Sequence, residues 1–537
     1  MSASKQSHSF IEQSAPMPRD SMVRCAGDDI SPRATGLQPP CRQVSLMRPA
    51  LSGLAASCAV VFGAVLGGSS FMSHLPGAWF FGTPGGPLGS LGAGGKHPRL
   101  LAVLAVYGGL VLLTSTWVTL LRTISRHRGV PVRRVLGVIA LWALPFMLAP
   151  PLFSRDVYSY AGQGEMVSHH IDPYVYGPGV LGATPFNALA GPLWESTPAP
   201  YGPTFLWLDG AAADLSEHQI LPDLALLRLI ELGGLALVVA GLPTLARETG
   251  REPVEVVLLG VGSPLVLTSL VGGAHNDALM VGLLVAGLVV ARRIGPVPGI
   301  ILCTLAAGVK APAALGALFI GWNWAGPRAT TRARILHTLA AGAVSAGSLS
   351  VLSAVSGIGW GWVRMLSVPA KISTGVTPVN ATARLMSGMA HLAGIDLSLH
   401  TVRSVLDGLG LVVAVCLGIW FLTRSPITGL VRGLGLTLLV LALLGPILWA
   451  WYLSWGLVVL AAVAAGRLRR WVIALSVVGA FIGVAAVLGM TKVVLHLGAV
   501  DDLLLIFSLA VAALVPSLRF GRRQLPSPFS PLTPGLA

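Results

Sequence analysis

Charged side chains are scarce in this sequence. Only 11% of its 537 residues are charged, whereas 54% are hydrophobic, and the mean hydropathy is +0.76. A soluble chain of this length would fold into several domains and would need a charged surface to remain in solution. The composition therefore excludes a soluble multidomain protein and indicates an integral membrane protein.

Cysteine is also scarce. The five cysteines are an odd number, no two have Cys-x-x-Cys spacing, and the last three lie in apolar runs. A disulfide framework and a zinc knuckle both need regularly spaced cysteines, so neither is expected. Residues 1–48 lack the apolar core of a signal peptide and are expected to form a disordered cytoplasmic tail.

Acidic residues are fewer than basic ones, 21 against 36, which gives a net charge of +15. In a soluble protein such an excess would indicate a polyanionic partner. Here most Lys and Arg residues fall in loops on one side of the expected topology, as the positive-inside rule requires of cytoplasmic loops. Nucleic acid is therefore not an expected partner.

Apolar runs long enough to cross a membrane recur along the chain. They cover residues 51–70, 100–121, 135–153, 222–246, 254–272, 276–291, 335–356, 403–422, 430–446, 449–465, 471–490 and 502–518. A further run, 297–321, is interrupted by Lys310 and Pro312 and is expected to form a broken hairpin. The fold class is thus an all-α polytopic membrane protein with about 12 to 14 segments. These segments fill residues 49–520, and 521–537 form a cytoplasmic C-terminal tail.

Two long polar segments, 154–221 and 357–402, are expected on the external side. The first is rich in Pro, Trp and Tyr, a composition that suits a rigid, preorganised site. The second carries cations that the positive-inside rule does not explain: Arg364, Lys371, Arg384 and Arg403. An anionic lipid head group would explain them, and so would solvation at the surface.

Asp156 is the strongest catalytic candidate. It follows Arg155 where the third apolar run ends, and a helix starting there would place Tyr160 and Gln163 on the same face. A carboxylate at the boundary between lipid and water is well placed to act as a base. Alternatively, Asp156 caps the helix or pairs with Arg155.

Other polar and aromatic residues extend this candidate site. Asp172 and Tyr201 lie among prolines and aromatics, which suits either a sugar-binding surface or an interfacial aromatic belt. Trp449 and Tyr452 allow the same two interpretations. His275, Asn276 and Asp277 separate two apolar runs, where they contact substrate or cap a helix. The spacing around His275 does not indicate a metal site.

Four strings narrow the interpretation: SRDVYSYAGQGEM at 154–166, DPY at 172–174, TPAPYGPTF at 197–205 and GGAHNDALM at 272–280. They closely resemble the actinobacterial polyprenol-phosphomannose-dependent α-1,6-mannosyltransferases of lipomannan and lipoarabinomannan synthesis. These are GT-C class glycosyltransferases. The resemblance covers roughly residues 50–520. Unlike the common GT-C plan, two expected spans precede the one that leads into the first external segment.

The resemblance implies an inverting transfer of mannose from polyprenyl-phosphomannose to the 6-hydroxyl of a lipid-anchored α-1,6-mannan, at the external face of the plasma membrane. It implies that Asp156 is the catalytic base. Lys310, Arg364, Lys371 and Arg384 are candidates to bind the donor phosphate. Substrate contacts are expected from Arg155, Tyr160, Asp172, Tyr201, His275, Asn276, Asp277, Trp449 and Tyr452.

No metal and no cofactor other than the lipid-linked donor is expected, although the sequence leaves open whether a divalent ion assists. Two other functions remain open. A transporter or flippase of a lipid-linked sugar would share the broken helices and external cations but would not need a base. A GT-C transferase with another sugar or acceptor would share the base.

Overall fold

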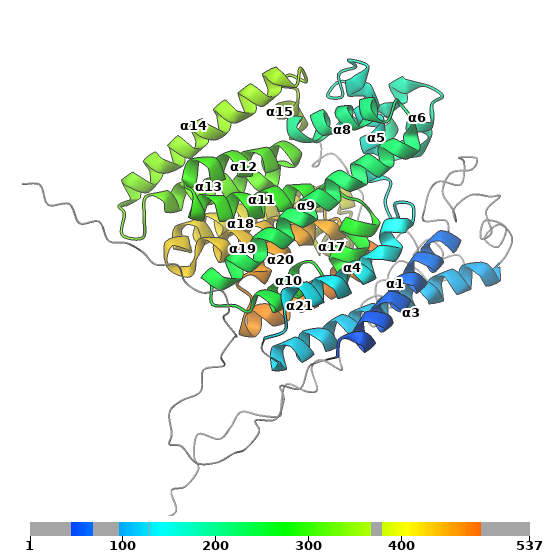
Figure 1. The fold of residues 1–537 in the computed structure, drawn as a ribbon. Helices are drawn as coiled ribbons and strands as arrows, with labels where there is room; N and C mark the ends of the chain where they lie inside the picture. Colours follow the sequence, from blue (N-terminus) through cyan, green and yellow to red (C-terminus); the bar gives the residue numbers. More distant parts are fainter. Residues whose placement is uncertain (1–44, 68–95, 128, 367–377, 485–537) are drawn as a thin grey trace, which may run out of the picture. The chain divides into compact units, whose positions relative to one another are not determined.

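The computed structural model describes residues 45–67, 96–127, 129–366 and 378–484 (Figure 1). In these ranges every regular element is a helix and no strand forms. The expected all-α class is therefore confirmed. Near the N-terminus, α1 (Met47–Leu66) runs alongside α3 (Lys96–Arg126) and also contacts α4 (Val132–Leu148).

The proline-rich segment 154–221 is built largely from short helices. These are α5 (Asp156–Ser168), η1 (Pro178–Leu181), α6 (Pro185–Ala190), α7 (Pro192–Glu195) and α8 (Pro203–Leu215). Four of them begin at a proline, whose fixed φ suits the first helical position and whose missing N–H costs nothing there. The prolines thus act as helix starts that order this segment.

The expected spans at 254–272 and 276–291 are divided differently in the structure. After α9 (Ile220–Glu248), the chain forms α10 (Pro253–Gly260), a π-helical turn η2 (Val266–Gly272) and α11 (Asp277–Arg293). Pro264 cannot donate a backbone hydrogen bond, which favours a break after α10. The axis then bends by 107° between η2 and α11.

The expected break inside 297–321 is confirmed. α12 (Pro296–Val309) ends at Lys310, which has an extended backbone with φ −148° and ψ 124°. A single 3-10 turn, η3 (Ala311–Ala313), leads from it into α13 (Ala314–Trp324). Lys310 therefore lies at a gap between helices.

The remaining elements complete the helical assembly. They are α14 (Thr331–Val355), α15 (Trp362–Met365), α17 (Pro378–Leu392), α18 (Leu399–Thr428), α19 (Leu430–Leu444), η4 (Ala450–Tyr452), α20 (Leu453–Ala461) and α21 (Gly466–Gly483). The tails expected at 1–48 and 521–537 fall wholly or almost wholly outside the described residues, as does the run 502–518.

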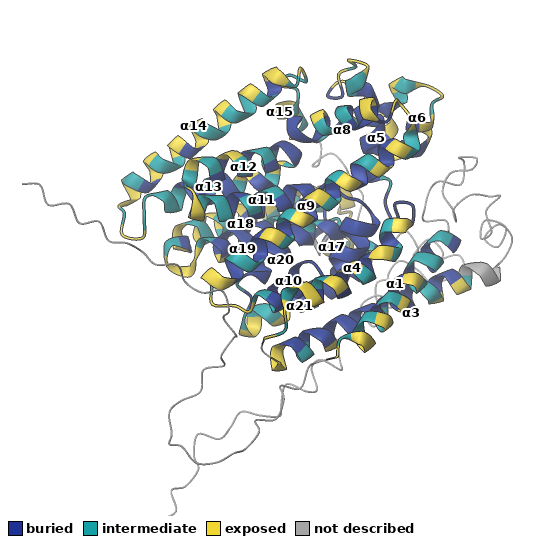
Figure 2. Ribbon diagram, in the orientation of Figure 1, coloured by how far each residue is buried: buried dark blue, intermediate teal, exposed yellow. Residues whose placement is uncertain are grey.

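Five described helices are long and apolar enough to cross a membrane: α1, α3 from Leu100, α9, α14 and α18. The bent pair of η2 and α11 makes a sixth if it is counted as one span. Several of the expected 12 to 14 segments are instead shorter helices. Exposed residues run along the length of α14 (Figure 2), and they include large apolar side chains such as Leu336 and Val351. We conclude that the chain is an integral membrane protein.

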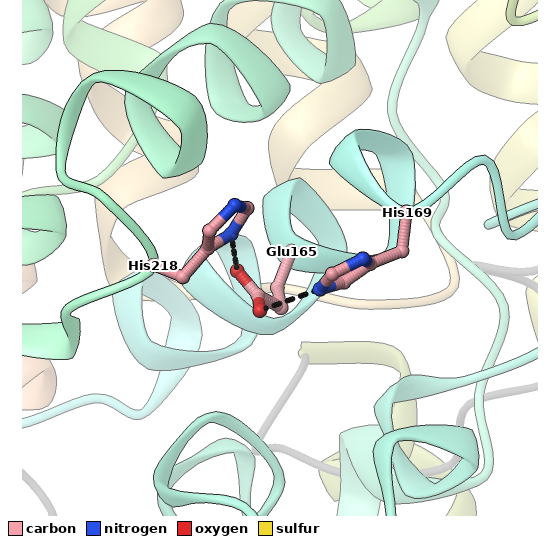
Figure 3. Close-up of side chains that lie close together, drawn as sticks. All are labelled: Glu165, His169 and His218. Carbon is pink, nitrogen blue, oxygen red and sulfur yellow. Dashed lines mark hydrogen bonds and ion pairs between the residues drawn. The ribbon is translucent and has the colours of Figure 1, made fainter.

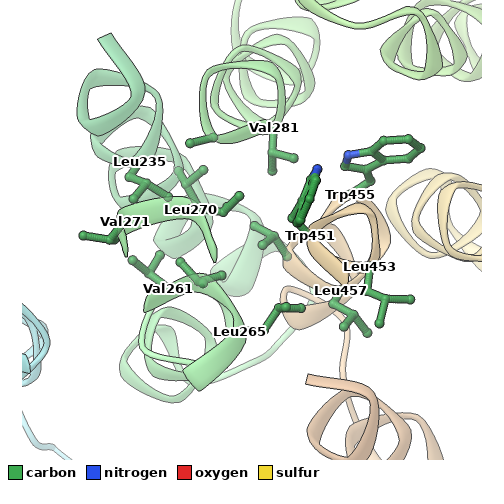
Figure 4. Packing of buried hydrophobic residues seen from close by; sticks show 14 of the residues in the cluster. Leu235, Val261, Leu265, Leu270, Val271, Val281, Trp451, Leu453, Trp455 and Leu457 are labelled. Carbon is green, nitrogen blue, oxygen red and sulfur yellow. The ribbon is translucent and has the colours of Figure 1, made fainter. Parts of the chain in front are cut away.

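Buried apolar side chains lock the bend against the C-terminal helices (Figure 4). Leu265 and Leu270, from the η2 region, pack with Val281 of α11 and with Trp451 and Trp455 of the η4–α20 segment. This packing holds together the helix ends that carry the candidate site.

Candidate active site

Asp156 is the first residue of α5, and the residue is only 8% exposed. Its backbone N–H donates to Ser154 Oγ at 3.1 Å, and Ser159 Oγ donates to its carbonyl at 2.7 Å. The N-cap residue of α5 is Arg155, whose side chain makes no capping hydrogen bond, and Asp156 occupies the first helical position. The carboxylate therefore lies at the positive end of the α5 dipole.

Two ring nitrogens from distant segments face the Asp156 carboxylate. Trp194 Nε1, from α7, donates to Oδ1 at 3.2 Å, and His275 Nε2 lies 3.7 Å from Oδ2. His275 Nδ1 lies 2.7 Å from the Ser269 carbonyl, which can only accept a hydrogen bond. The His275 proton therefore belongs on Nδ1, and the neutral ring presents an acceptor nitrogen to the space beside Asp156.

The position of His275 is fixed by stacking and by backbone contacts. Its ring stacks on Trp451 with a centroid distance of 3.8 Å, and Trp451 stacks on Trp449 at 5.1 Å. Leu152 N–H donates to the Gly272 carbonyl at 2.9 Å, which joins the segments before Asp156 and before His275. Phe153 and Ala274, one in each segment, have positive φ values of 66° and 50°. Such strain in non-glycine residues is typical of functional sites.

Asp277 and Lys310 form a buried ion pair beside this group. Asp277 is the first residue of α11 and is fully buried, and its Oδ2 lies 2.9 Å from Lys310 Nζ. Trp455 Nε1 donates to the other carboxylate oxygen of Asp277, and Asn276 Oδ1 lies 3.4 Å from the Lys310 ammonium. Neither Asn276 nor Asp277 caps α11 through its side chain. Lys310 thus pairs with an acid inside the protein.

Aromatic rings surround the Lys310 ammonium. It lies 4.7 Å from the ring centroid of Tyr452 and 5.8 Å from those of Tyr201 and Trp455. Tyr201 meets Tyr160 edge to face at 5.2 Å, and Tyr160 lies on α5, one turn from Asp156. Burial raises the pKa of both the Tyr160 and the Tyr201 phenol, so both remain neutral hydrogen-bond donors.

Four buried polar atoms in this group have no hydrogen-bond partner among the described residues: Tyr160 Oη, His275 Nε2, Asn276 Nδ2 and Trp451 Nε1. Buried polar groups are usually paired within the protein, so such atoms need an external partner. These unpaired atoms lie in the group around the Asp156 carboxylate and the Lys310 ammonium, an arrangement typical of a site that binds a polar ligand.

The expected substrate-binding residues are only partly brought together. Tyr160, Tyr201, His275, Asn276, Asp277, Trp449 and Tyr452 belong to the group around Asp156 and Lys310. The Arg155 side chain packs against Gly191 at the junction of α6 and α7. A Cβ built on Gly191 would lie only 2.5 Å from Arg155 Cδ. Asp172 is exposed and accepts a hydrogen bond from the Tyr174 backbone N–H at 2.8 Å, as a turn residue does.

The expected phosphate-binding cations fall into three groups. Lys310 belongs to the site. Arg364 on α15 and Arg384 on α17 have exposed side chains, and Lys371 lies outside the described residues. Phosphate binding by all four residues stays a prediction. Arg403, also noted in this segment, lies 3.4 Å from Asp407 one helical turn away.

Sequence reasoning missed two sets of residues. The indoles of Trp194 and Trp455 bind the two carboxylates of the site, although nothing in the sequence distinguishes them from belt tryptophans. The second set, Glu165, His169 and His218, lies near the other end of α5 (Figure 3). The Glu-x-x-x-His spacing of its first two members was a usable signal, because residues four apart share a helix face.

Ionisable side chains are held at the breaks between membrane helices, so the chain is a membrane protein with a buried polar site. Comparison with known proteins identifies its enzyme family. Residues 50–326 match a family model described as alpha-(1->6)-mannopyranosyltransferase, N-terminal domain. Residues 379–515 match a model described as the MptB C-terminal domain. No solved structure matches the chain.

Related proteins carry the same description. The chain is 33% identical to alpha-(1->6)-mannopyranosyltransferase A of Mycobacterium tuberculosis over 69% of this chain and 73% of that protein. It is 32% identical to a probable alpha-(1->6)-mannopyranosyltransferase of Mycolicibacterium smegmatis over 66% of this chain and 69% of that protein. It is 28% identical to alpha-(1->6)-mannopyranosyltransferase B of Corynebacterium glutamicum over 80% of this chain and 75% of that protein. The chain therefore belongs to the α-(1→6)-mannopyranosyltransferase family and is a mannosyltransferase.

Proposed function

We propose that this enzyme transfers mannose, with inversion, from polyprenyl-phosphomannose to the 6-hydroxyl of a lipid-anchored α-1,6-mannan during lipomannan and lipoarabinomannan synthesis. The observation that carries the proposal is the buried Asp156 carboxylate facing the acceptor nitrogen of His275 at 3.7 Å. Phosphate departs as an anion and needs no protonating acid. A single carboxylate base is therefore sufficient, whereas an inverting glycosidase needs two carboxyl groups.

We assign the base step to one oxygen of Asp156. Oδ1 already accepts a hydrogen bond from Trp194, which leaves Oδ2 to accept the proton of the attacking 6-hydroxyl. His275 Nε2 can accept a hydrogen bond from a second sugar hydroxyl, because its own proton lies on Nδ1. The acceptor sugar would then be both deprotonated and oriented by one pair of residues.

Lys310 is the cation that we assign to the donor phosphate. Asp277 and Asn276 occupy two of its three ammonium donors, and a phosphate oxygen can take the third. The charge that grows on the leaving phosphate would be stabilised there, an effect often worth about 2.7 to 4 kcal/mol per group. Arg364, Lys371 and Arg384 remain candidates for a second phosphate contact.

An apolar groove beside α13 suits the polyprenyl chain. It has a volume of about 200 Å³, and its first lining residue, Leu315, is five positions after Lys310. Its walls come from α13, α18 and α19: Leu315, Leu318, Phe319, Ala414, Val415, Gly418, Ile419, Leu422, Thr437 and Leu441. A lipid chain in this groove would leave its phosphate close to Lys310.

We place the site on the extracytoplasmic side of the plasma membrane. The arginine-rich connection between α3 and α4, within 122–134, lies at the far end of α4, which leads into segment 154–221. The arginines at 467–470 begin α21, just after the loop at the far end of α20, the helix that follows η4. By the positive-inside rule those loops are cytoplasmic. Nucleotide sugars are absent from the external compartment, which favours a lipid-linked donor there.

Asp156→Asn tests the base. We expect transfer from polyprenyl-phosphomannose to synthetic α-1,6-mannosides in washed membranes to fall by about 10²- to 10⁴-fold, while the donor still binds. Glu252→Gln, which removes the charge of an exposed carboxylate just before α10, is the matched control and should retain activity.

Native turnover by the Asp156→Asn protein would overturn the proposal. Movement of the lipid across vesicles without any glycosidic product would favour a transporter or flippase. Linkage analysis of the product separates an α-1,6-mannan acceptor from any other.

A further inference from the structure

A second group of polar side chains lies near the C-terminal end of α5, away from Asp156. Glu165 Oε1 lies 3.0 Å from His169 Nε2, and Glu165 Oε2 lies 3.0 Å from His218 Nδ1 (Figure 3). One ligating atom from each of the three residues lies within 4.8 Å of the other two. Nothing in the mannosyl transfer described above uses this group.

The spacing is close to that of metal ligands. Two ligands bound to a tetrahedral Zn²⁺ at their usual distances of about 2.0 to 2.1 Å are roughly 3.3 Å apart. Each imidazole lies 3.0 Å from a different oxygen of Glu165, and the three ligand atoms lie within 4.8 Å of one another, so the side chains must draw together to share one ion. Glu165 is buried, whereas His169 and His218 are exposed, so an ion can enter from solvent.

The backbone holds the three residues together. Glu165 and His169 are one turn apart on α5, and the imidazole rings of His169 and His218 stack at a centroid distance of 5.0 Å. His218 has a positive φ of 59° in the turn after α8, and its backbone N–H donates to the Ala213 carbonyl at 3.1 Å. A hydrogen bond between Ser168 and Asp214 ties the same two segments. Strained backbone held by such contacts is typical of functional positions.

We propose that Glu165, His169 and His218 bind a first-row divalent transition-metal ion, for which Zn²⁺ is the best match. Two imidazoles and one carboxylate, with solvent in the fourth position, form a recognised Zn²⁺ ligand set. Calcium and magnesium prefer oxygen ligands and are disfavoured by the two imidazoles. The ion would link α5 to the turn after α8.

The site is independent of the transfer chemistry. Asp156 and Glu165 are nine residues apart on α5, which corresponds to roughly 13 Å of helix rise. The ion would therefore fix the helix that carries Asp156 without touching the reacting groups. Its presence can be tested without any measurement of mannosyl transfer.

Metal analysis of the full-length protein provides the test. The detergent-purified chain, without a polyhistidine tag, is treated with a chelator, dialysed against Zn²⁺ and analysed for bound metal and melting temperature. We expect one Zn²⁺ per chain and a higher melting temperature with Zn²⁺. Substitution of Co²⁺ should give the visible absorption of a tetrahedral nitrogen and oxygen site.

Variants locate the bound ion. His169→Ala and His218→Asn should each weaken Zn²⁺ binding by at least about tenfold, because each removes a ligand. Asn is chosen at 218 because it tolerates the positive φ of that residue. His170→Asn, at an exposed neighbour that also has a positive φ, is the matched control and should bind like the parent chain.

Two results would overturn the proposal. One is a parent chain that retains no stoichiometric Zn²⁺, which would leave only histidine–glutamate hydrogen bonds. The other is unchanged Zn²⁺ binding in the His169→Ala/His218→Asn double variant. Gel filtration of each variant shows whether it is folded, and the parent chain alone decides the first result.

Discussion

Two buried aspartates begin helices in the candidate site, and their different partners suit them to different tasks. Asp277 has a lysine partner 2.9 Å away, so its charge is neutralised inside the protein. Asp156 faces an indole and a neutral imidazole instead. The oxygens of Asp277 are occupied by Lys310 and Trp455, whereas Oδ2 of Asp156 has no hydrogen-bond donor among the contacts described above. Asp156 is therefore the better base, and Asp277 is better suited to position Lys310.

Breaking the Asp277–Lys310 pair should destabilise the protein strongly. We expect Lys310→Met to lower the free energy of unfolding by about 3 to 5 kcal/mol, because the charge of the fully buried Asp277 loses its ionic partner. The Asp277→Asn/Lys310→Met double variant should lose less than the sum of the two single variants. Thermal unfolding in detergent measures all three proteins, and additive losses would show that the pair is not coupled.

The buried carboxyl group of Asp209 should make the stability of the protein depend on pH. Asp209 is fully buried, and neither of its carboxylate oxygens has a partner in the described part of the chain. Burial raises the pKa of this carboxyl well above the ordinary value, and the charges of Asp223 and Glu231 raise it further. The folded protein then keeps this proton at pH values where the unfolded chain, with a pKa of about 3.9, has lost it. The contribution of Asp209 to stability should therefore fall as the pH rises above about 4, up to the folded pKa.

Asp209→Asn removes this titration and should raise the melting temperature at pH 7 relative to the parent chain. The difference between the two proteins should shrink at pH 5. Asp172→Asn, at an exposed carboxylate, should change neither value appreciably. A parent chain and an Asp209→Asn variant with parallel pH profiles would contradict the assignment.

The sequence predicted which site residues lie together only where those residues are close in the chain. Asp156 and Tyr160 could be placed on one helix face because they are four residues apart. His275, Trp194 and Lys310 reach the same place only because three other segments end there. Such convergence depends on tertiary packing, which one sequence does not encode in any local pattern.

At the scale of elements, helix breaks were predictable where their cause was strong. Lys310 and Pro312 interrupt an apolar run with a charge and a missing donor, and the break occurs there. The break after α10 involves only Gly262, Ser263 and Pro264, which a run of valines and leucines conceals. The mean hydropathy of a segment measures its affinity for lipid and does not report whether its helix is continuous.

Helix contacts depend on individual glycines. A Cβ on Gly234 of α9 would lie 2.4 Å from Leu279 Cα of α11, whereas a Cβ on Gly233 would meet nothing within 4 Å. We expect Gly234→Ala to lower the melting temperature by forcing the helices apart. Gly233→Ala should stabilise the chain by up to about 1 kcal/mol through helix propensity. Equal effects in thermal unfolding would show that α9 and α11 do not pack this closely.

For the whole molecule, composition predicted the environment but not how the apolar runs are divided into helices. Low charge and high hydropathy identified a membrane protein, and the described long apolar helices agree. Among the described residues, apolar runs that were expected to be single spans are divided into shorter helices such as α10 and α20. Short pieces are tolerated in a membrane protein because neighbouring helices bury their ends, and those ends carry the polar site.

The proposed lipid path links the groove between α13, α18 and α19 to Lys310, and one glycine tests it. A Cβ on Gly418 of α18 would lie 3.2 Å from Thr437 Cγ2 across the groove. A phenylalanine there should obstruct the polyprenyl chain and raise the KM for long-chain donors, while kcat changes little and water-soluble short-chain donors are unaffected. Gly408→Phe, at an exposed position on the same helix with nothing within 4 Å of its Cβ, is the matched control. If both variants show the same KM for every donor length, the isoprenoid does not occupy this groove.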